Sequence, residues 1–152
     1  MQGKCRGHEP LIIHAAKPAT LNGAIHRFTY SLHADGECWT WHGNQNIDGY
    51  PLFPFRSREW LGHRWSYAYF IGGHGTRQQL DHVCANTLCV RPDHLFPVSA
   101  KENSRLRTKR AKNPLQWITP TRYVRQWSDT AEQFAQALGL PGTTPDQYHL
   151  AA

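Results

Sequence analysis

The chain has 152 residues, enough for one domain with a modest hydrophobic core or for a small domain with an appendage. Lysine and arginine outnumber aspartate and glutamate by 17 to 11, for a formal net charge of +6, and this excess favours an anionic partner, most often nucleic acid. No apolar run approaches the roughly 18 residues that cross a bilayer, and MQGKCRGHEP at the N-terminus lacks the apolar segment of a secretory signal. We therefore expect a cytoplasmic protein without membrane contact, in which clustered cysteines bind metal rather than form disulfides.

The first half of the chain predicts short elements. Residues 1–27 contain helix-breaking proline and glycine and predict a loop with at most a short helix. CWTWHG (38–43) alternates apolar and polar side chains, as a strand does. YPLFPFRS (50–57) follows after turn-forming residues, so we expect these two strands to form a hairpin. Apolar residues in REWLGHRWSYAYFIGG (58–73) recur at helical spacing until two glycines end the pattern.

The second half predicts a strand, a loop, a strand and two helices. QQLDHV and HLFPV read as strands on either side of a cysteine-containing loop. Ser99 and Glu102 have the spacing of a capping box, which predicts a helix from Ser99 to about Ala111. After an extended linker, a last helix is expected over Thr130–Leu138, because its apolar residues share one face.

The loop sequence DHVCANTLCVRPDH concentrates residue types that bind metals. Two cysteines and a histidine recur in it at five-residue intervals, and zinc takes four such ligands in a tetrahedron. We expect a structural zinc site formed by Cys38, Cys84, Cys89 and His94. A closed site of this kind ties the loop to a distant strand. The alternative is a pair of buried cysteines beside a hydrogen-bonded core histidine, and a separate site at Cys5 and His8 has weaker support.

Asp81 and His82 precede the loop, and Asn103 lies one turn into the capped helix. The oxygens of Asp81 and Asn103 suit Mg²⁺, Mn²⁺ or Ca²⁺ rather than zinc. His82 can then take a proton from water as a general base, with a pKa near neutrality. This set suits phosphodiester hydrolysis. Because adjacent strand residues point to opposite faces, His82 and Asn103 are stronger candidates than Asp81.

Basic side chains follow Asn103 along the expected helix. Arg107 and Arg110 share its face at i+4 and i+7, and Arg105 and Lys109 widen the positive surface. We expect this helix to follow a phosphate backbone. The alternative is an ordinary solvated basic face.

Three stretches together resemble a known family: CWTWHGNQNIDGYPLF, HRWSYAYFIGG and LDHVCANTLCVRPDHLFPVSAKEN. They resemble the HNH endonucleases of phages and mobile introns, which belong to the ββα-metal, or His-Me finger, superfamily. The resemblance extends over roughly residues 36–107. The cysteine spacing is similar to that of the Cys-His box homing endonucleases in the same superfamily.

The resemblance implies a role for each matching residue. His82 corresponds to the histidine that activates water, and Asn103 to the asparagine that binds the catalytic Mg²⁺ or Mn²⁺. Asp81 corresponds to the acidic metal ligand of HNH members. His94 stands where the zinc-bearing relatives have a zinc-binding histidine, and Cys38 matches their distant fourth ligand.

Other positions are less closely matched. Arg58 falls near an arginine that contacts the scissile phosphate in the zinc-bearing relatives, with Arg56 as the rival, and His63 is expected in the core or in a hydrogen bond. Many phage relatives carry a second Cys/His module, but this chain has no cysteine after Cys89. The last helix could belong to a helix-turn-helix, although a packing or dimerisation helix is the stronger expectation.

Together these features predict an α+β fold. We expect a small zinc-stapled ββα-metal core with an N-terminal β-hairpin and helix, plus a C-terminal helical extension. The expected parts are an N-terminal extension (1–27), a nuclease domain (28–112) and a linker with the C-terminal helical extension (113–152). The expected DNA contacts are Arg56, Arg58, Arg105, Arg107, Lys109 and Arg110.

The predicted function is a metal-dependent endonuclease that nicks or cuts double-stranded DNA, with structural Zn²⁺ and catalytic Mg²⁺ or Mn²⁺. The resemblance implies a protein encoded by a phage or mobile element that acts in the bacterial cytoplasm. A homodimer is compatible with this prediction. One alternative is a non-cleaving zinc-stabilised nucleic-acid-binding protein. Another is a zinc-dependent hydrolase of a small molecule, which a zinc ion with four protein ligands disfavours.

Overall fold

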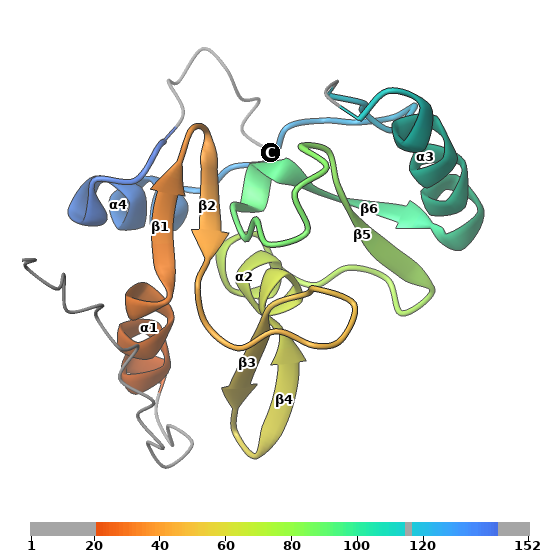
Figure 1. Cartoon of the computed structure of the whole chain (residues 1–152). Helices are drawn as coiled ribbons and strands as arrows, with labels where there is room; N and C mark the ends of the chain where they lie inside the picture. Colours follow the sequence, from red (N-terminus) through yellow and green to blue (C-terminus); the bar gives the residue numbers. More distant parts are fainter. Residues whose placement is uncertain (1–20, 115–116, 143–152) are drawn as a thin grey trace, which may run out of the picture.

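The fold is described from a computed structural model, which defines residues 21–114 and 117–142 (Figure 1). These residues form four α-helices and three two-stranded antiparallel sheets, so the predicted α+β class is confirmed. The elements in chain order are α1 (Leu21–Tyr30), β1 (Leu32–Asp35), β2 (Cys38–Trp41), β3 (Leu52–Phe55), β4 (Arg58–Leu61), α2 (Gly62–Phe70), β5 (Gln78–His82), the 3₁₀ helix η1 (Pro92–His94), β6 (Leu95–Ser99), α3 (Ala100–Lys112) and α4 (Asp129–Leu138). None of the helices in this part of the chain combines the length and the apolar character needed to cross a membrane.

The strands pair differently from the prediction in the first half of the chain. The hairpin expected between 38–43 and 50–57 is wrong, because β2 pairs with β1 and β3 pairs with β4. Tight turns explain both hairpins: Gly36 has a φ of 55°, and Arg56 and Ser57 have φ values of 46° and 61°. Such left-handed turn residues match the twist of paired strands.

Two helix predictions also need correction. The helix expected from residue 58 begins at Gly62, because residues 58–61 form β4 instead. Of residues 1–27, expected as a loop with at most a short helix, residues 21–27 belong to the ten-residue helix α1, which continues to Tyr30. Ala24 and Phe28, four residues apart on that helix, are fully buried. Tertiary packing of one helical face therefore outweighs the weak local signal.

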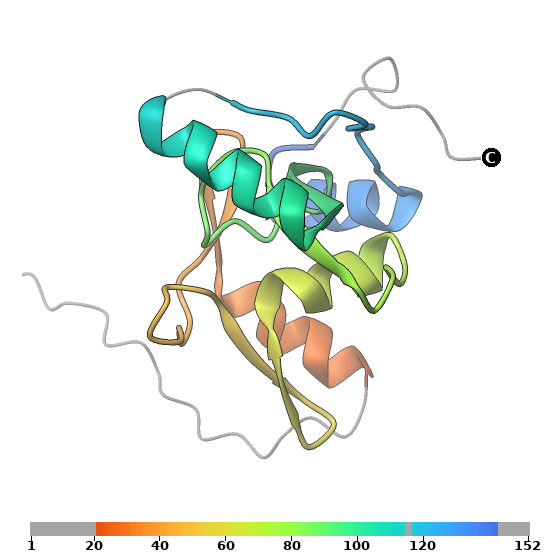
Figure 2. The ribbon, with the colours of Figure 1, turned by 90° about the vertical axis from the view of Figure 1, so that its right-hand side faces the viewer.

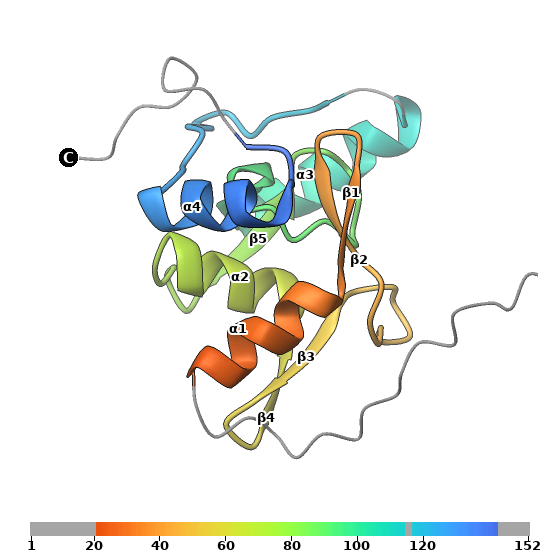
Figure 3. The ribbon, with the colours of Figure 1, turned by 90° about the vertical axis from the view of Figure 1, so that its left-hand side faces the viewer.

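The core is aromatic and joins elements from all parts of the described chain. Phe28 of α1 lies 4.8 Å from Trp65 of α2, and Phe134 of α4 lies 5.0 Å from Phe70 of α2 (ring centroids). The three helices are stacked with α2 between α4 and α1 (Figure 3). The expected boundary between residues 27 and 28 falls inside α1, and both α1 and α4 contribute to this single cluster.

The C-terminal helix packs against the core. It spans Asp129–Leu138 and ends at Gly139 in the left-handed conformation, so the predicted helix is confirmed. Ala131 and Ala135 are fully buried, and the indole of Trp39 donates a 2.8 Å hydrogen bond to the Pro141 carbonyl beyond the helix. This arrangement agrees with the packing alternative, whereas residues 143–152 of the possible helix-turn-helix lie outside the described part.

The β5–β6 hairpin and α3 form the predicted strand–loop–strand–helix unit (Figure 2). The strands pair from Gln78 opposite Ser99 to His82 opposite Leu95. The Ser99 side chain accepts a 3.1 Å hydrogen bond from the Glu102 amide, so the predicted N-cap is present. Leu106, the one buried residue of α3, anchors the helix against Val98 and Ile118.

Candidate active site and zinc cluster

The structure brings the four expected zinc ligands together. They come from the first residue of β2, the loop after β5 and the end of η1, and their ligand atoms all lie within 4.8 Å of one another: Cys38, Cys84, Cys89 and His94. The His94 Nδ1 lies 3.6 Å from the Cys38 sulfur and 3.5 Å from the Cys89 sulfur. Ligands of tetrahedral zinc, at bond lengths near 2.0–2.3 Å, lie about 3.5–4 Å apart. The donor set therefore fits a zinc ion.

The electrostatics of the three thiols also favour a cation. Hydrogen bonds from Cys84 and Cys89 stabilise a thiolate at Cys38 and lower its pKa far below the usual range. That arrangement raises the pKa of Cys84 to about 12, with the Cys38 contact as the largest cause, and burial raises the pKa of Cys89. Three crowded sulfurs cannot all ionise beside one another without a positive charge. A divalent ion supplies that charge.

His82 lies at the end of β5, in a buried cluster of rings. Its Nε2 is 3.1 Å from the Cys89 carbonyl oxygen. Its ring centroid lies 4.7 Å from that of His63 and 6.0 Å from that of Tyr50. A carbonyl only accepts hydrogen bonds, so Nε2 carries the proton and Nδ1 of the neutral ring is the basic nitrogen. The loop between β5 and β6, which carries Cys84 and Cys89 and is called the zinc loop below, therefore fixes the tautomer of the candidate base.

Burial lowers the pKa of His82 to about 4, partly opposed by the Cys89 hydrogen bond, which raises it. The imidazole is therefore neutral at pH 7 and ready to accept a proton. The prediction placed this pKa near neutrality, and the lower value follows from desolvation of the charged form. His63, expected in the core or in a hydrogen bond, is buried against this ring and its Nδ1 has no hydrogen-bond partner among the described residues.

Asp81 points away from His82, to the α3 side of the hairpin. Both of its carboxylate oxygens accept hydrogen bonds from Arg110, at 2.5 and 2.7 Å. The two strand neighbours thus serve opposite faces of β5, as the alternation of side chains requires. An expected metal ligand and an expected DNA contact are instead paired with each other.

Asn103 is partly exposed on α3, on the same side as Asp81. Its Nδ2 donates a 2.6 Å hydrogen bond to the Gln79 side chain, and Gln79 and Asp81 share one face of β5. Because the amide group uses its nitrogen there, Oδ1 keeps its capacity to bind a cation. In the described residues no hydrogen bond joins Asn103 to His82, whose side chain lies on the opposite face of β5, so the structure does not bring these two predicted site residues into direct contact.

The expected DNA-contacting side chains fall into two groups. Arg107 and Lys109 are exposed, and within residues 21–114 and 117–142 neither side chain takes part in an ion pair or a hydrogen bond. Arg105 is paired with Glu102 at 2.6 Å, and Arg110 is held by Asp81. At the β3–β4 hairpin, the guanidinium carbon of Arg58 lies 5.4 Å from the ring centroid of Trp60, and that of Arg56 lies 5.1 Å from that of Phe55.

Sequence reasoning missed a buried ion network beside the zinc cluster. Arg91 is fully buried and makes a two-bond ion pair with Asp93, at 2.5 and 3.0 Å. It also donates to the carbonyls of Glu37 and Gly142. The only signal in the sequence was an arginine two residues before an aspartate inside the zinc loop. Partners more than fifty residues away in sequence could not be identified from it.

Comparison with known proteins agrees with the predicted resemblance. Residues 61–105 match the sequence model of the HNH endonuclease family, described as HNH endonuclease. The matched segment begins at Leu61, the last residue of β4, and contains Asp81, His82, three of the four zinc-cluster residues and Asn103. No curated protein and no solved structure matches the chain. The family match confirms the resemblance and indicates metal-dependent nuclease chemistry in this segment.

Proposed function

We propose that this protein is a metal-dependent endonuclease that hydrolyses phosphodiester bonds of double-stranded DNA, with His82 as the general base. The observation that carries the proposal is the His82 hydrogen bond to the Cys89 carbonyl, inside a segment that matches HNH endonucleases. This bond holds the ring in the tautomer whose Nδ1 can accept a proton from water.

The chain's own groups support proton transfer. The neutral ring accepts the proton of the attacking water at Nδ1, and the imidazolium that forms keeps its Nε2–H bond to the Cys89 carbonyl. That bond becomes stronger when the donor is charged. A single Mg²⁺ or Mn²⁺ ion, when bound, supplies positive charge at the phosphate and at the leaving 3′ oxygen.

Asn103 is the proposed protein ligand of this ion, because its Oδ1 is not used by the Gln79 hydrogen bond and its residue lies inside the matched segment. Asp81 can join as a ligand only if Arg110 releases its carboxylate. The cluster of three cysteines and His94 would hold a structural Zn²⁺, closed by four protein ligands and therefore without a part in the chemistry.

The DNA would be held by side chains that form no ion pair with the described residues. Arg107 and Lys109 on α3 and Arg56 and Arg58 at the β3–β4 hairpin are the proposed phosphate contacts. A double-strand break would require either a second active site, as in a homodimer, or two successive nicks by one active site. Origin in a phage or mobile element, and action in the bacterial cytoplasm, stay predictions from the resemblance.

The decisive experiment is incubation of the purified protein with supercoiled plasmid and Mg²⁺. We expect nicked or linear product, and no product when Mg²⁺ is omitted from a buffer that leaves the zinc in place. His82→Ala should abolish cleavage while keeping zinc content and DNA affinity, whereas His26→Ala, at an exposed position of α1, should cut like the wild type. Plasmid that is bound but never cut would instead support the non-cleaving nucleic-acid-binding alternative.

A further inference from the structure

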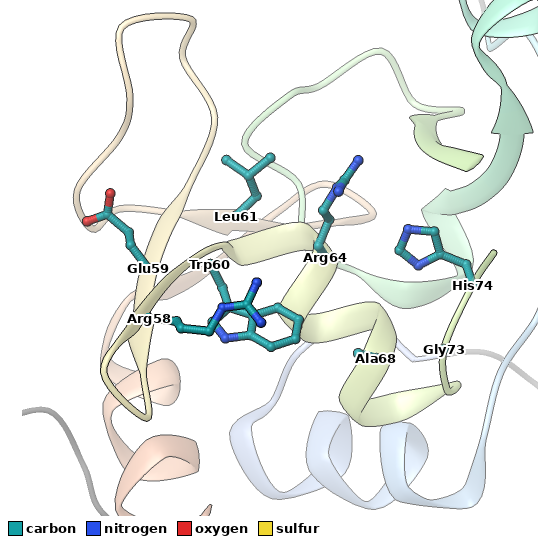
Figure 4. A pocket seen from close by; sticks show the side chains of 8 residues that line it. All are labelled: Arg58, Glu59, Trp60, Leu61, Arg64, Ala68, Gly73 and His74. Carbon is teal, nitrogen blue, oxygen red and sulfur yellow. The ribbon is translucent and has the colours of Figure 1, made fainter. Parts of the chain in front are cut away.

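A basic pocket of about 380 Å³ opens between β4, α2 and the chain after α2 (Figure 4). Two arginines and a histidine line it: Arg58 from β4, Arg64 from α2 and His74 from the segment after α2. Figure 4 shows Arg58 lying along Trp60, while Arg64 and His74 occupy another side of the pocket. Neither Arg64 nor His74 was assigned a role by sequence reasoning or by the family match.

The positive charge of this pocket is not balanced by the protein. In the described part of the chain, neither Arg58 nor Arg64 forms an ion pair. Glu59 also lines the pocket, but its carboxylate is directed away from Arg64 and His74 (Figure 4). The pocket therefore presents two unneutralised guanidinium groups, which favours an anionic ligand.

Arg64 carries a further sign of an absent partner. Its Nε is buried and has no hydrogen-bond acceptor among the described residues. A buried donor normally has a partner, because leaving it unpaired is costly. Burial and, to a smaller extent, the charge of Arg64 lower the pKa of His74, so these two side chains share one electropositive environment. An anion placed between them would satisfy the donors of both.

The pocket is connected to the candidate base through α2. Arg64 follows His63 in the first turn of α2, and the His63 ring lies 4.7 Å from the His82 ring. The guanidinium carbon of Arg58 lies 5.4 Å from the Trp60 ring centroid, and an arginine stacked on a ring keeps its in-plane N–H groups available to a ligand. Helix α2 therefore contributes both a residue that lines the pocket and a residue packed on the candidate base.

We propose that Arg64 and His74, together with Arg58, bind a backbone phosphate of the DNA strand that flanks the phosphate being cleaved. This inference rests on the proposed function, since it assigns a second contact to the same DNA strand. Arg64 acts as a positioning residue: it fixes the strand relative to His82 and does not touch the reacting atoms. Its planar guanidinium can donate two parallel hydrogen bonds to one phosphate, which a lysine cannot do.

The test compares Arg64→Gln with Arg122→Gln, which removes the same charge from an exposed arginine outside the pocket. Affinity for a 20-base-pair duplex is measured by fluorescence anisotropy over a range of salt concentrations. We expect Arg64→Gln to weaken binding about tenfold and to reduce the slope of log K against log[salt] by about 0.9, the value for one lost phosphate contact. Equal slopes for the two variants would overturn the proposal.

Two further measurements distinguish a DNA contact from a folding defect and from a free-anion site. Ala68→Glu places a carboxylate at the pocket wall while keeping Arg64; it should reproduce the loss, and it carries the test if Arg64→Gln fails to fold. The imidazole NMR signals of His74 should shift when duplex is added and stay unchanged with inorganic phosphate alone. A shift with phosphate but not with duplex would overturn the proposal in favour of a free-anion site.

These measurements distinguish a failure of the pocket assignment from a failure of the proposed function. If the wild type cuts plasmid but Arg64→Gln matches Arg122→Gln in affinity and salt slope, the pocket assignment fails and the nuclease stands. If the wild type binds duplex without cutting it and the Arg64 effect is present, the nuclease assignment fails and the pocket stands. No duplex binding by the wild type overturns both.

Discussion

Asp81 and Arg110 form a two-bond ion pair across the contact between β5 and α3, with Nη1–Oδ1 and Nη2–Oδ2 distances of 2.5 and 2.7 Å. Asp81 is 2% exposed, and Arg110 also donates to the Ile118 carbonyl at 2.6 Å. The pair joins the strand of the candidate base to the last turns of α3 and to the segment that follows. Its geometry makes Asp81 a structural residue in this state of the protein.

We expect Asp81→Asn to destabilise the fold by about 3 kcal/mol, because it leaves the charge of the partly buried Arg110 without a partner. Urea unfolding of the zinc-loaded protein measures this loss. The double variant Asp81→Asn with Arg110→Gln should recover part of it, as a double-mutant cycle requires for a direct interaction. A variant of normal stability that needs more Mg²⁺ for cleavage would show instead that Asp81 serves mainly as a metal ligand.

Removal of one cluster sulfur should prevent zinc binding and folding together. Cys89→Ser takes away the fully buried member of the cluster, and the free energy of zinc binding, about 10 kcal/mol or more in small zinc domains, is comparable to the whole stability of a domain. We expect the variant to purify without zinc, by elemental analysis, and to lose its cooperative thermal transition. Cys5→Ser is the control and should retain one zinc per chain; a well-folded wild type without zinc would contradict the assignment.

The α3 arginines should differ in their contribution to DNA binding. Arg107 is exposed and unpaired in the described structure, whereas Arg105 is held by Glu102. We expect Arg107→Ala to weaken binding to any duplex and to lower the salt slope by about 0.9, as measured by anisotropy. Arg105→Ala should have a smaller effect, because that side chain must first give up its ion pair. An unchanged slope for Arg107→Ala would rule out its phosphate contact.

His63 should make the protein sensitive to acid. Burial, with smaller contributions from His82, Arg64 and His74, lowers the pKa of His63 to about 2, below the value of about 6.5 in the unfolded chain. The unfolded state therefore binds the proton more readily, and stability is lost as the pH falls below about 6.5, at no more than about 1.4 kcal/mol per pH unit.

His63→Phe keeps a ring at this position but removes the titration. Denaturant unfolding between pH 7 and pH 5 should show a smaller loss of stability in this variant than in the wild type. Zinc release in acid affects both proteins, so the difference between the two curves isolates His63. Parallel curves would mean that His63 accepts a proton in the folded state.

The C-terminal helix should stabilise the aromatic core. Phe134 contacts the rings of Phe28, Trp39 and Phe70 at centroid distances of 6.3, 5.5 and 5.0 Å. We expect Phe134→Ala to lower the free energy of unfolding by about 3 kcal/mol, whereas Gln133→Ala, at an exposed position of α4, should have little effect. Equal effects of both variants would show that the packing of Phe134 does not stabilise the core, so that α4 would be available for another role such as dimerisation.

The sequence predicted best where the signals are local. Ser99 and Glu102 defined the start of α3, and the even spacing of Cys84, Cys89 and His94 identified the zinc loop before any contact was known. These signals depend on a few neighbouring residues, so a single sequence contains them.

Features that depend on distant partners could not be predicted in the same way. A turn at Gly36 and packing in the aromatic core decide that β2 pairs with β1. The alternation of apolar and polar residues in β2 would suit pairing with β3 equally well. Alternation did show that Asp81 and His82 face apart, but not that Arg110, 29 positions away, would take both oxygens of Asp81. Likewise, α1 is helical because Ala24 and Phe28 are buried by residues that come later in the chain.

The guanidinium of Arg91 connects three distant parts of the molecule. It reaches the chain just before β2 through Glu37, the loop between β5 and β6 through Asp93 and the segment after α4 through Gly142, and it lies 5.2 Å from the ring centroid of Trp127. Truncating the chain after residue 112 would remove the aromatic ring and one carbonyl from the surroundings of this buried cation. The smallest transplantable unit is therefore longer than the family motif, and any chimera that reuses this zinc loop needs to carry the C-terminal extension with it.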